Sequence, residues 1–570
     1  MRESGLVHGK GPGAFWRRDI SARTALALAA GLALLRLALT GLQLLLITPN
    51  GAPLDDTLMY TTAVNITQGQ WLGEYGWLTL SKYMLFPLYL ALVHTLGVPY
   101  LLAGQLLYTA AAAAGGAALW PLVRSRRARL AVFAALLWNP AACAAQVTLR
   151  IYRDNITPAL ALALFAGFIG FALRRAQPLR RTWPWLLCAA AGLTGMVLNR
   201  EDGIWVLAFA LPAALLTAVF LFCEKDARRL RKTLALAVPF AVLTVSVLAL
   251  CAMNQAHYGR FILSDFSSGE FADAYGALTR VESAEPQEKV PVPRDVRERL
   301  YSLVPELAAI EPYLETDMMY NNYGSVPEKE FYGGGFYWAL REAASDAGYY
   351  ESAETARAYF AAVAEKVNAL CDDGTLPAVS GRRSGTTPPV RAQDVLPTLA
   401  EGFVNMGRAL TFAEAEPAWW DTMSEQLSME PQLREEYEAW LKSGCNWMAQ
   451  EGTNRPYYSP VRQIAYKLLE LVRFAYMLAL PLAFAAALLW QARSARRVWQ
   501  NSGDALCWLA ALGLLLCMLL RCMMIAFMFV TSFNDVPRIM YLAAVHPMAI
   551  LYACIGCAML AAARRKGGGA

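Results

Sequence analysis

Charged residues and histidine are scarce in this chain, and their scarcity excludes several classes of protein. Asp, Glu, Lys and Arg make up 17% of the 570 residues and apolar residues 56%, which is too apolar for an ordinary soluble domain. The four histidines are scattered and have no zinc-binding spacing. No stripe of basic and aromatic residues is present, so a nucleic-acid partner is not expected.

Cysteine is not scarce, but its placement says little about metals. Nine of the eleven cysteines lie in or beside apolar segments, where cysteine behaves as a small apolar residue. The other two, Cys371 and Cys445, lie in a polar stretch. They could form one disulfide in an oxidising compartment.

The apolar residues fall into blocks of about 20, the length that crosses roughly 30 Å of hydrocarbon. The first block, 24–47, is too long for a signal-peptide core and no small-residue cleavage site follows, so we interpret it as a retained span. Segment 83–97 is shorter and contains Pro87 and His94, which favours an interfacial or re-entrant helix. The sequence therefore predicts an all-α polytopic membrane protein of about ten spans: 24–47, 99–123, 130–149, 155–173, 183–199, 203–223, 233–253, 466–490, 505–531 and 540–562.

Basic residues alternate between the loops. They cluster at 17–23, 124–129, 174–181, 225–232, 493–497 and 564–566. The intervening short loops carry few, so the positive-inside rule places the clusters and both termini in the cytoplasm. This alternation holds only if 83–123 crosses once. We expect a multi-pass protein of the cell membrane.

Three domains follow from this topology. Residues 1–253 form an N-terminal transmembrane module with an outer loop at 48–98, and residues 463–570 form a C-terminal transmembrane segment. Between them, 254–462 is polar and long enough for an extracytoplasmic soluble domain. Apolar residues recur at helical spacing in 340–370 and 424–443, which predicts a mainly helical domain.

Unusual polar residues gather on the outer face. Asp55 and Asp56 follow the first span, and the next outer loops read RIYRD at 150–154, NRED at 199–202 and NDVPRIMY at 534–541. Acids and arginines held at one lipid boundary are placed to act on a lipid-anchored substrate. Arg36 and Arg521 lie inside predicted spans, where a charge is costly, and no acid within a span is an obvious partner.

The stretch 53–90 resembles the first outer loop of the GT-C superfamily of polyprenyl-phosphate-sugar glycosyltransferases. That superfamily includes protein O-mannosyltransferases, lipid A aminoarabinose transferases and oligosaccharyltransferases. The resemblance rests on the acidic pair, Tyr60, the run AVNITQGQWLGEY and Lys82. It extends through Asp154 and Arg200 to PRIMYLAAVHP at 537–547. It covers most of 20–253 and, more weakly, 530–550, whereas 254–462 resembles nothing we can name.

The resemblance implies a GT-C-like bundle and roles for individual residues. Asp55 would be the general base, with Asp56 and Asp154 as further catalytic acids that bind a metal or orient the acceptor. The residues implied in substrate binding are Lys82, Arg150, Arg153, Arg200, Arg538 and Tyr60. The physical argument agrees, because a carboxylate at a partly desolvated boundary has a raised pKa and fixed cations stabilise a leaving phosphate.

Each residue also has a purely structural interpretation. Asp55 or, better, Asp56 could be the N-cap of a helix that starts near Thr57. Asp154 could cap the following helix while Arg150 and Arg153 bind lipid phosphates. Arg200 could pair with the acids of its own turn, and Arg538 could be an interfacial anchor.

The sequence thus predicts an inverting glycosyltransferase that moves a sugar from a polyprenyl-phosphate donor to an extracytoplasmic glycan, lipid or protein acceptor. The resemblance leaves open whether a divalent cation takes part. The main alternative is a lipid-linked glycan transporter or assembly scaffold without catalytic activity, and a third is a degenerate member whose outer domain is a binding module. Transport predicts polar residues along a path through the spans, whereas here they gather at one face.

Overall fold

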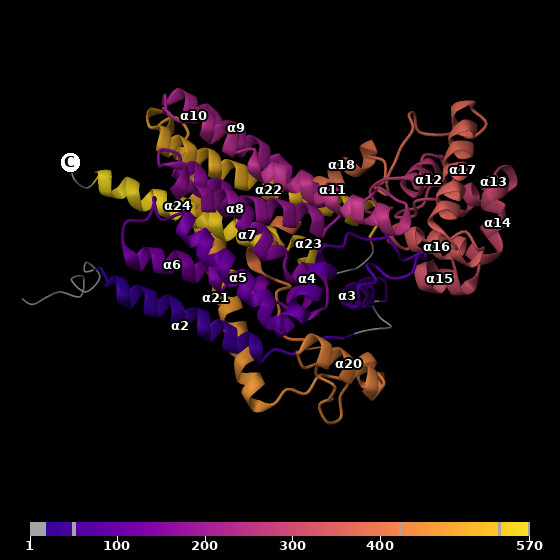
Figure 1. The fold of residues 1–570 in the computed structure, drawn as a ribbon, viewed down its shortest axis with the longest axis horizontal. Helices are drawn as coiled ribbons and strands as arrows, with labels where there is room; N and C mark the ends of the chain where they lie inside the picture. Colours follow the sequence, from indigo (N-terminus) through magenta and orange to yellow (C-terminus); the bar gives the residue numbers. More distant parts are fainter. Residues whose placement is uncertain (1–18, 48–52, 421–423, 534–536, 568–570) are drawn as a thin grey trace, which may run out of the picture.

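A computed structural model describes residues 19–47, 53–420, 424–533 and 537–567. Part of the 534–541 turn therefore lies outside the described residues, as do the start of loop 48–98 and part of the 17–23 cluster. The chain is a bundle of long helices with a smaller helical domain at one end (Figure 1). The one sheet among the described residues pairs β1 (Gly324–Ser325) with β2 (Glu330–Phe331). The expected all-α class is confirmed.

Ten helices of the described residues make up the main part of the bundle. They are α2 (Ala22–Gly41), α5 (Tyr100–Ala118), α6 (Arg126–Leu137), α7 (Thr157–Leu173), α8 (Leu179–Asn199), α9 (Leu207–Cys223), α11 (Val238–Tyr258), α21 (Pro460–Ser494), α22 (Ser502–Thr531) and α24 (Val545–Gly567). Among the described residues, eight helices are long and apolar enough to cross a membrane. The short helix expected at 83–97 is α4 (Leu85–Thr95).

Two of the ten predicted spans do not meet that criterion. Segment 130–149 is not one helix: α6 ends at Leu137, and short 3₁₀ (Pro140–Cys143) and π (Ala145–Leu149) turns follow. Pro140 has no N–H to donate and breaks the helix there. Segment 183–199 is helical within α8, whose first turns carry Arg180 and Arg181.

Close packing of α7 against α8 sets the geometry of one end of the bundle. A Cβ on Gly167 would overlap the backbone of Ala189, and a Cβ on Gly192 would overlap that of Leu164. Small residues at such contacts let membrane helices approach closely. The antiparallel pair therefore places the residues before α7 beside the residues after α8.

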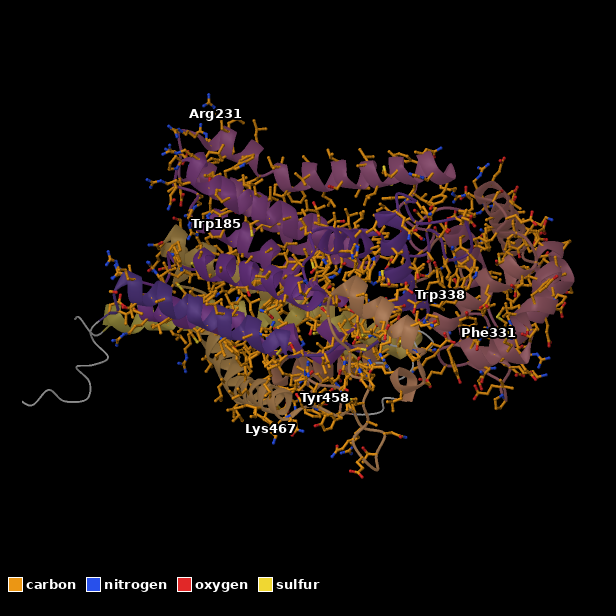
Figure 2. The ribbon with its side chains drawn as sticks, turned by 60° about the horizontal axis from the view of Figure 1, so that its bottom comes forward. Trp185, Arg231, Phe331, Trp338, Tyr458 and Lys467 are labelled. Atoms are coloured by element: carbon orange, nitrogen blue, oxygen red, sulfur yellow. The ribbon has the colours of Figure 1, made fainter. Side chains whose placement is uncertain are left out.

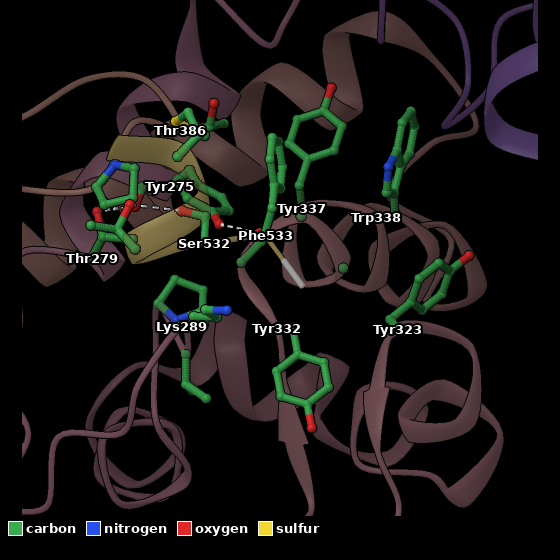
Figure 3. Close-up of a pocket in the computed structure, with 18 of the residues that line it drawn as sticks. Tyr275, Thr279, Lys289, Tyr323, Tyr332, Tyr337, Trp338, Thr386, Ser532 and Phe533 are labelled. Carbon is green, nitrogen blue, oxygen red and sulfur yellow. Dashed lines mark hydrogen bonds between the residues drawn. The ribbon is translucent and has the colours of Figure 1, made fainter. Parts of the chain in front are cut away.

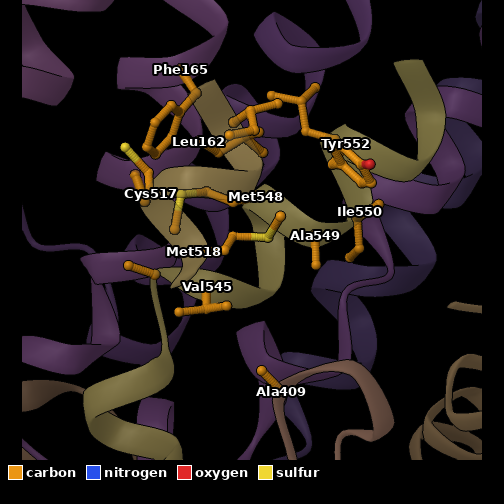
Figure 4. Close-up of a cluster of buried hydrophobic side chains, with 14 of the residues drawn as sticks. Leu162, Phe165, Ala409, Cys517, Met518, Val545, Met548, Ala549, Ile550 and Tyr552 are labelled. Carbon is orange, nitrogen blue, oxygen red and sulfur yellow. The ribbon is translucent and has the colours of Figure 1, made fainter. Parts of the chain in front are cut away.

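A continuous apolar core fills the bundle. Figure 4 shows side chains from α7, α22 and α24 in contact, with Ala409 of α18 (Ala392–Thr411) at their edge. A charged side chain lies within this core. Arg36 is fully buried and its guanidinium donates to the carbonyl of Ala142 (2.9 Å) and to Thr40 (3.1 Å).

The insertion 254–462 is mainly helical, as predicted, and has two parts. Residues 266–378 share their own apolar core and form what we call the helical domain. Its helices are α12 (Glu270–Leu278), α13 (Arg294–Leu303), α14 (Pro305–Leu314), α15 (Asp317–Tyr323), α16 (Gly333–Asp346) and α17 (Ala353–Asp372). The rest of the insertion packs elsewhere, because α18 lies along α22 and α20 (Pro431–Leu441) contacts α3 (Leu58–Thr67) through Tyr437 and Tyr60.

The two ends of the molecule differ in chemistry. Arg231, in the basic stretch 225–232, lies at one end of the bundle, and Phe331 of the helical domain lies at the other (Figure 2). The helix α24 runs toward the basic end (Figure 1). This arrangement is the one that the predicted orientation requires, and the orientation itself stays a prediction.

The two cysteines of the insertion 254–462 are not cross-linked. Cys371 and Cys445 are both free and buried in different apolar clusters, so they form no disulfide.

Candidate functional site

A cleft of about 1340 Å³ lies where the bundle meets the helical domain. Its bundle side is lined by Asp55, Lys82, Tyr152, Arg153, Glu201 and Tyr541. Its other side is lined by aromatic and polar residues of the helical domain and by the end of α22 (Figure 3). Charged groups from loops far apart in the sequence therefore meet in one cavity.

Asp55 lies at the bundle side of this cleft, in the single π-helical turn η1 (Pro53–Thr57) that precedes α3. Its Oδ1 accepts hydrogen bonds from the Lys82 ammonium and from the Tyr152 hydroxyl (3.0 Å). Its Oδ2 is 3.8 Å from the Arg150 guanidinium. The side chain is 41% exposed, whereas that of Lys82 is 8% exposed, so Asp55 is the more accessible partner of the pair.

The pKa of Asp55 is not raised, which corrects the physical argument made from sequence. Burial alone would raise the pKa of this carboxyl, but Lys82 and Arg150 outweigh burial and hold its pKa well below the usual range. The sequence could not show that two cations would surround this acid. Asp55 is therefore ionised across the ordinary pH range, and its proton affinity is low while Lys82 and Arg150 surround it.

Asp56 faces away from the cleft and pairs with Arg150. The guanidinium donates to both carboxylate oxygens, at 3.1 and 2.5 Å, and the two side chains are 4% and 13% exposed. Burial raises the pKa of Asp56 despite this pairing. Neither Asp55 nor Asp56 is the N-cap of α3. That position is held by Thr57, which makes no side-chain cap bond.

Arg153 is a cation on the wall of the cleft. Its guanidinium donates to Glu201 (2.7 Å), which also accepts from the backbone N–H of Tyr83 (2.8 Å). Its Nε is buried and has no hydrogen-bond partner among the described residues. This N–H is therefore not accessible from the cleft, and what Arg153 offers a ligand there is the charge of its guanidinium.

Behind the cleft, Asp154 and Arg200 form a buried ion pair at 2.9 Å, which the α7–α8 packing brings together. The pair continues to Asp202, at 3.3 Å from Arg200, and from Asp202 to Arg521, at 2.6 Å. Arg521 is thus neutralised by an acid from the NRED turn, which sequence reasoning did not identify. Neither Asp154 nor Arg200 lines the cleft, so both are placed to position other groups.

Tyr60 and Arg538 lie away from the cleft. Tyr60 stacks on Tyr437 with ring centroids 4.0 Å apart. Arg538 pairs with Glu401 and donates to Asn405 (3.2 Å), which holds α18 against the bundle. Their predicted roles in substrate binding have no geometric support here.

Several cleft residues were not identified from sequence. Tyr152 lies between the two arginines of RIYRD, and its ring lies within about 5 Å of three cationic groups. That motif could have indicated it. Tyr541 was visible only as part of a motif, and its ring is 4.9 Å from the Arg200 guanidinium. The residues of the helical domain carried no signal, since contacts between distant segments cannot be read from local pattern.

The acids of this site do not fit a divalent cation. In the described ranges, no group of three or more His, Cys, Asp or Glu side chains is arranged to hold a metal ion. Hard cations need several oxygen ligands, whereas Asp55, Asp56 and Asp154 each face a Lys or Arg. We therefore derive no step through a metal.

Comparison with known proteins gives weak matches only. No family model and no curated protein matches the sequence. Among solved structures, the chain is similar to ArnT from Cupriavidus metallidurans in the apo state and bound to undecaprenyl phosphate. Both are 12% identical with a TM-score of 0.31, over 94% and 95% of this chain and 78% of ArnT. At this TM-score the similarity carries no argument about activity.

Proposed function

We propose that this membrane protein is an inverting glycosyltransferase that moves a sugar from a polyprenyl phosphate to an acceptor hydroxyl in the cleft. The observation that carries the proposal is the position of Asp55: an ionised, accessible carboxylate on a cavity wall that also carries Lys82 and Arg153. Glycosyl transfer from a phosphate needs this pairing of a base with cations.

The reaction is a single displacement. The acceptor oxygen forms a bond to the anomeric carbon while the bond from that carbon to the phosphate oxygen breaks, and the departing phosphate keeps the bonding electrons. Attack from the face opposite the leaving group inverts the anomeric carbon. The hydroxyl proton passes to Asp55. Since Oδ1 already accepts from Lys82 and Tyr152, the oxygen open to the acceptor is Oδ2.

Lys82 and Arg153 stabilise the leaving phosphate. The Lys82 ammonium has three N–H donors, of which one serves Asp55 and one reaches the Tyr152 hydroxyl at 3.3 Å. The third is available to a phosphate oxygen, and the Arg153 guanidinium on the same wall supplies a second cation. Both cations are largely buried, where a charge-assisted hydrogen bond is stronger than in water.

The test is sugar transfer by the purified protein in nanodiscs. Radiolabelled undecaprenyl-phosphate-linked glucose, mannose, galactose and arabinose serve as donors, and a cell-envelope extract supplies acceptors. We expect Asp55→Asn to lower the rate by about 10²–10⁴-fold, because an amide cannot take the proton. Glu74→Gln removes an exposed carboxylate from the same outer loop and should transfer normally. Transfer retained by Asp55→Asn, or no transfer from any donor by the unmodified protein, would overturn the proposal.

A further inference from the structure

The wall of the cleft that faces Asp55 is aromatic. Tyr323, Tyr332, Tyr337 and Trp338 come from the helical domain, and Phe533 comes from the segment just after α22. In Figure 3 these rings surround the cavity. Trp338 is half-buried, so part of its ring is accessible from the cleft.

Three consecutive glycines bring this wall together. Gly333, Gly334 and Gly335 begin α16 and line the cleft. A Cβ on Gly333 would lie 2.7 Å from the Cβ of Ser532, and a Cβ on Gly335 would overlap the carbonyl oxygen of Tyr323. Side chains at these positions would push α16 away from α22 and α15, so the glycines let the aromatic residues of three segments share one cavity.

The aromatic wall is held against the loop that carries Lys82. The Tyr337 hydroxyl donates to the carbonyl of Ser81 (3.1 Å), and Arg341 donates to the carbonyls of Trp77 (2.7 Å) and Thr79 (3.1 Å). The Trp338 ring lies 5.4 Å from the Lys82 ammonium, within cation–π range. A molecule resting on Trp338 is therefore adjacent to the Lys82–Asp55 pair.

The other residues that line the cleft indicate which kind of ligand it binds. Thr279, Gln287, Asn322, Thr386 and Gln393 supply neutral hydrogen-bonding groups around the rings. Among the described lining residues the charges balance: Lys82, Arg153, Lys289 and Arg391 are matched by Asp55, Glu201, Glu288 and Asp394. A polyanionic acceptor would meet as many acids as bases here.

The cleft is also large. Its volume of about 1340 Å³ exceeds the roughly 300–1,000 Å³ of most small-molecule sites. Carbohydrate rings have an apolar C–H face and a hydroxylated edge, so they complement aromatic faces surrounded by amide and hydroxyl groups. The space is sufficient for a donor headgroup together with more than one further ring.

From this wall we infer that the acceptor is a neutral oligosaccharide whose terminal rings stack on Trp338 and its aromatic neighbours, with one hydroxyl directed at Asp55. Calling this oligosaccharide the acceptor rests on the proposed function, but its binding does not require transfer to occur.

The experiment measures binding by titration calorimetry of the purified full chain in nanodiscs. The probes are maltotetraose, cellotetraose, mannotetraose and chitotetraose, with tetragalacturonate as an anionic counterpart. We expect at least one neutral tetrasaccharide to bind in preference to tetragalacturonate. Trp338→Ala should weaken that binding about tenfold or more, Trp338→Phe should restore part of it, and Trp499→Ala, an exposed residue outside the cleft, should not change it.

Binding of none of the neutral probes, tighter binding of tetragalacturonate, or unchanged affinity in Trp338→Ala would each overturn the inference. If Trp338→Ala fails to fold, Tyr332→Ala tests the same wall, since Tyr332 is half-buried and its hydroxyl reaches only the exposed Glu328 side chain. In Asp55→Asn the amide oxygen can still accept a hydrogen bond from the oligosaccharide hydroxyl, so the neutral probe should still bind while transfer is lost. If the unmodified protein binds the neutral probe but transfers no sugar, the oligosaccharide site stands and the transferase proposal fails. If transfer occurs and is unaffected by Trp338→Ala, the transferase proposal stands and the oligosaccharide site fails.

Discussion

The buried pair of Asp56 and Arg150 offers the sharpest test of how this site is built. The guanidinium donates to both oxygens of a carboxylate that is only 4% exposed. Replacing Arg150 with Met keeps the apolar stem but leaves the carboxylate buried without a cation. Removing one partner of a buried pair typically costs about 3–5 kcal/mol. We expect a loss of that size in the free energy of unfolding of Arg150→Met.

Two further variants show how much of this loss in the free energy of unfolding comes from the pairing itself. Asp56→Leu leaves Arg150 unpaired and should also be destabilised by a few kcal/mol, although Asp55 at 3.8 Å softens the effect. The double variant removes both charges and should be closer to the unmodified protein than the sum of the singles predicts. A coupling free energy of about 2 kcal/mol or more is the expected result for residues in direct contact.

The measurement is SDS-induced unfolding in mixed micelles, repeated at pH 5 and pH 8. Burial raises the pKa of Asp56 above its ordinary value of about 3.9, and loss of Arg150 raises it further. The native variant then holds a proton that the unfolded chain releases, so its stability falls as the pH rises. Arg150→Met should therefore be more destabilised at pH 8 than at pH 5. Additive single effects, or destabilisation that grows toward pH 5, would refute this account.

Further outcomes follow from the groups around the cleft. In Lys82→Gln the pKa of Asp55 should rise, so the acid limb of the residual transfer rate should move up by about 1–3 pH units, and a limb at unchanged pH would contradict the pairing. Arg341 is fully buried and binds Asp265 as well as the carbonyls of Trp77 and Thr79. Arg341→Met should therefore increase amide hydrogen exchange in 71–83 by about tenfold or more, and unchanged exchange would show that other contacts hold the domain.

The sequence predicted those features that depend on local pattern. Apolar block length predicted most of the helices that are long and apolar enough to cross a membrane, and Pro87 with His94 marked α4 as short. The motif positions placed Asp55, Lys82 and Arg153 at one end of the bundle, and all three line the cleft. These features were accessible because each depends on residues close together in the chain.

Features that depend on packing between distant segments were not accessible. Segment 130–149 is as apolar as a span, but Pro140 breaks its helix and the chain continues as short turns. Arg521 had no visible partner because Asp202 lies outside any span and 319 positions away. The lowered pKa of Asp55 has the same origin, since Lys82 and Arg150 come from separate loops.

The pairing of charges explains why one acid of this site is suited to catalysis and the others to structure. Asp56 and Asp154 are each almost fully buried against an arginine, so neither can reach a substrate without breaking a pair that is expensive to separate. Asp55 is exposed, and its partner Lys82 is a flexible ammonium with a donor to spare. When a phosphate binds Lys82, the cation is shared between two anions and its hold on Asp55 weakens. Binding of the donor would thus raise the proton affinity of Asp55 at the moment when a base is required.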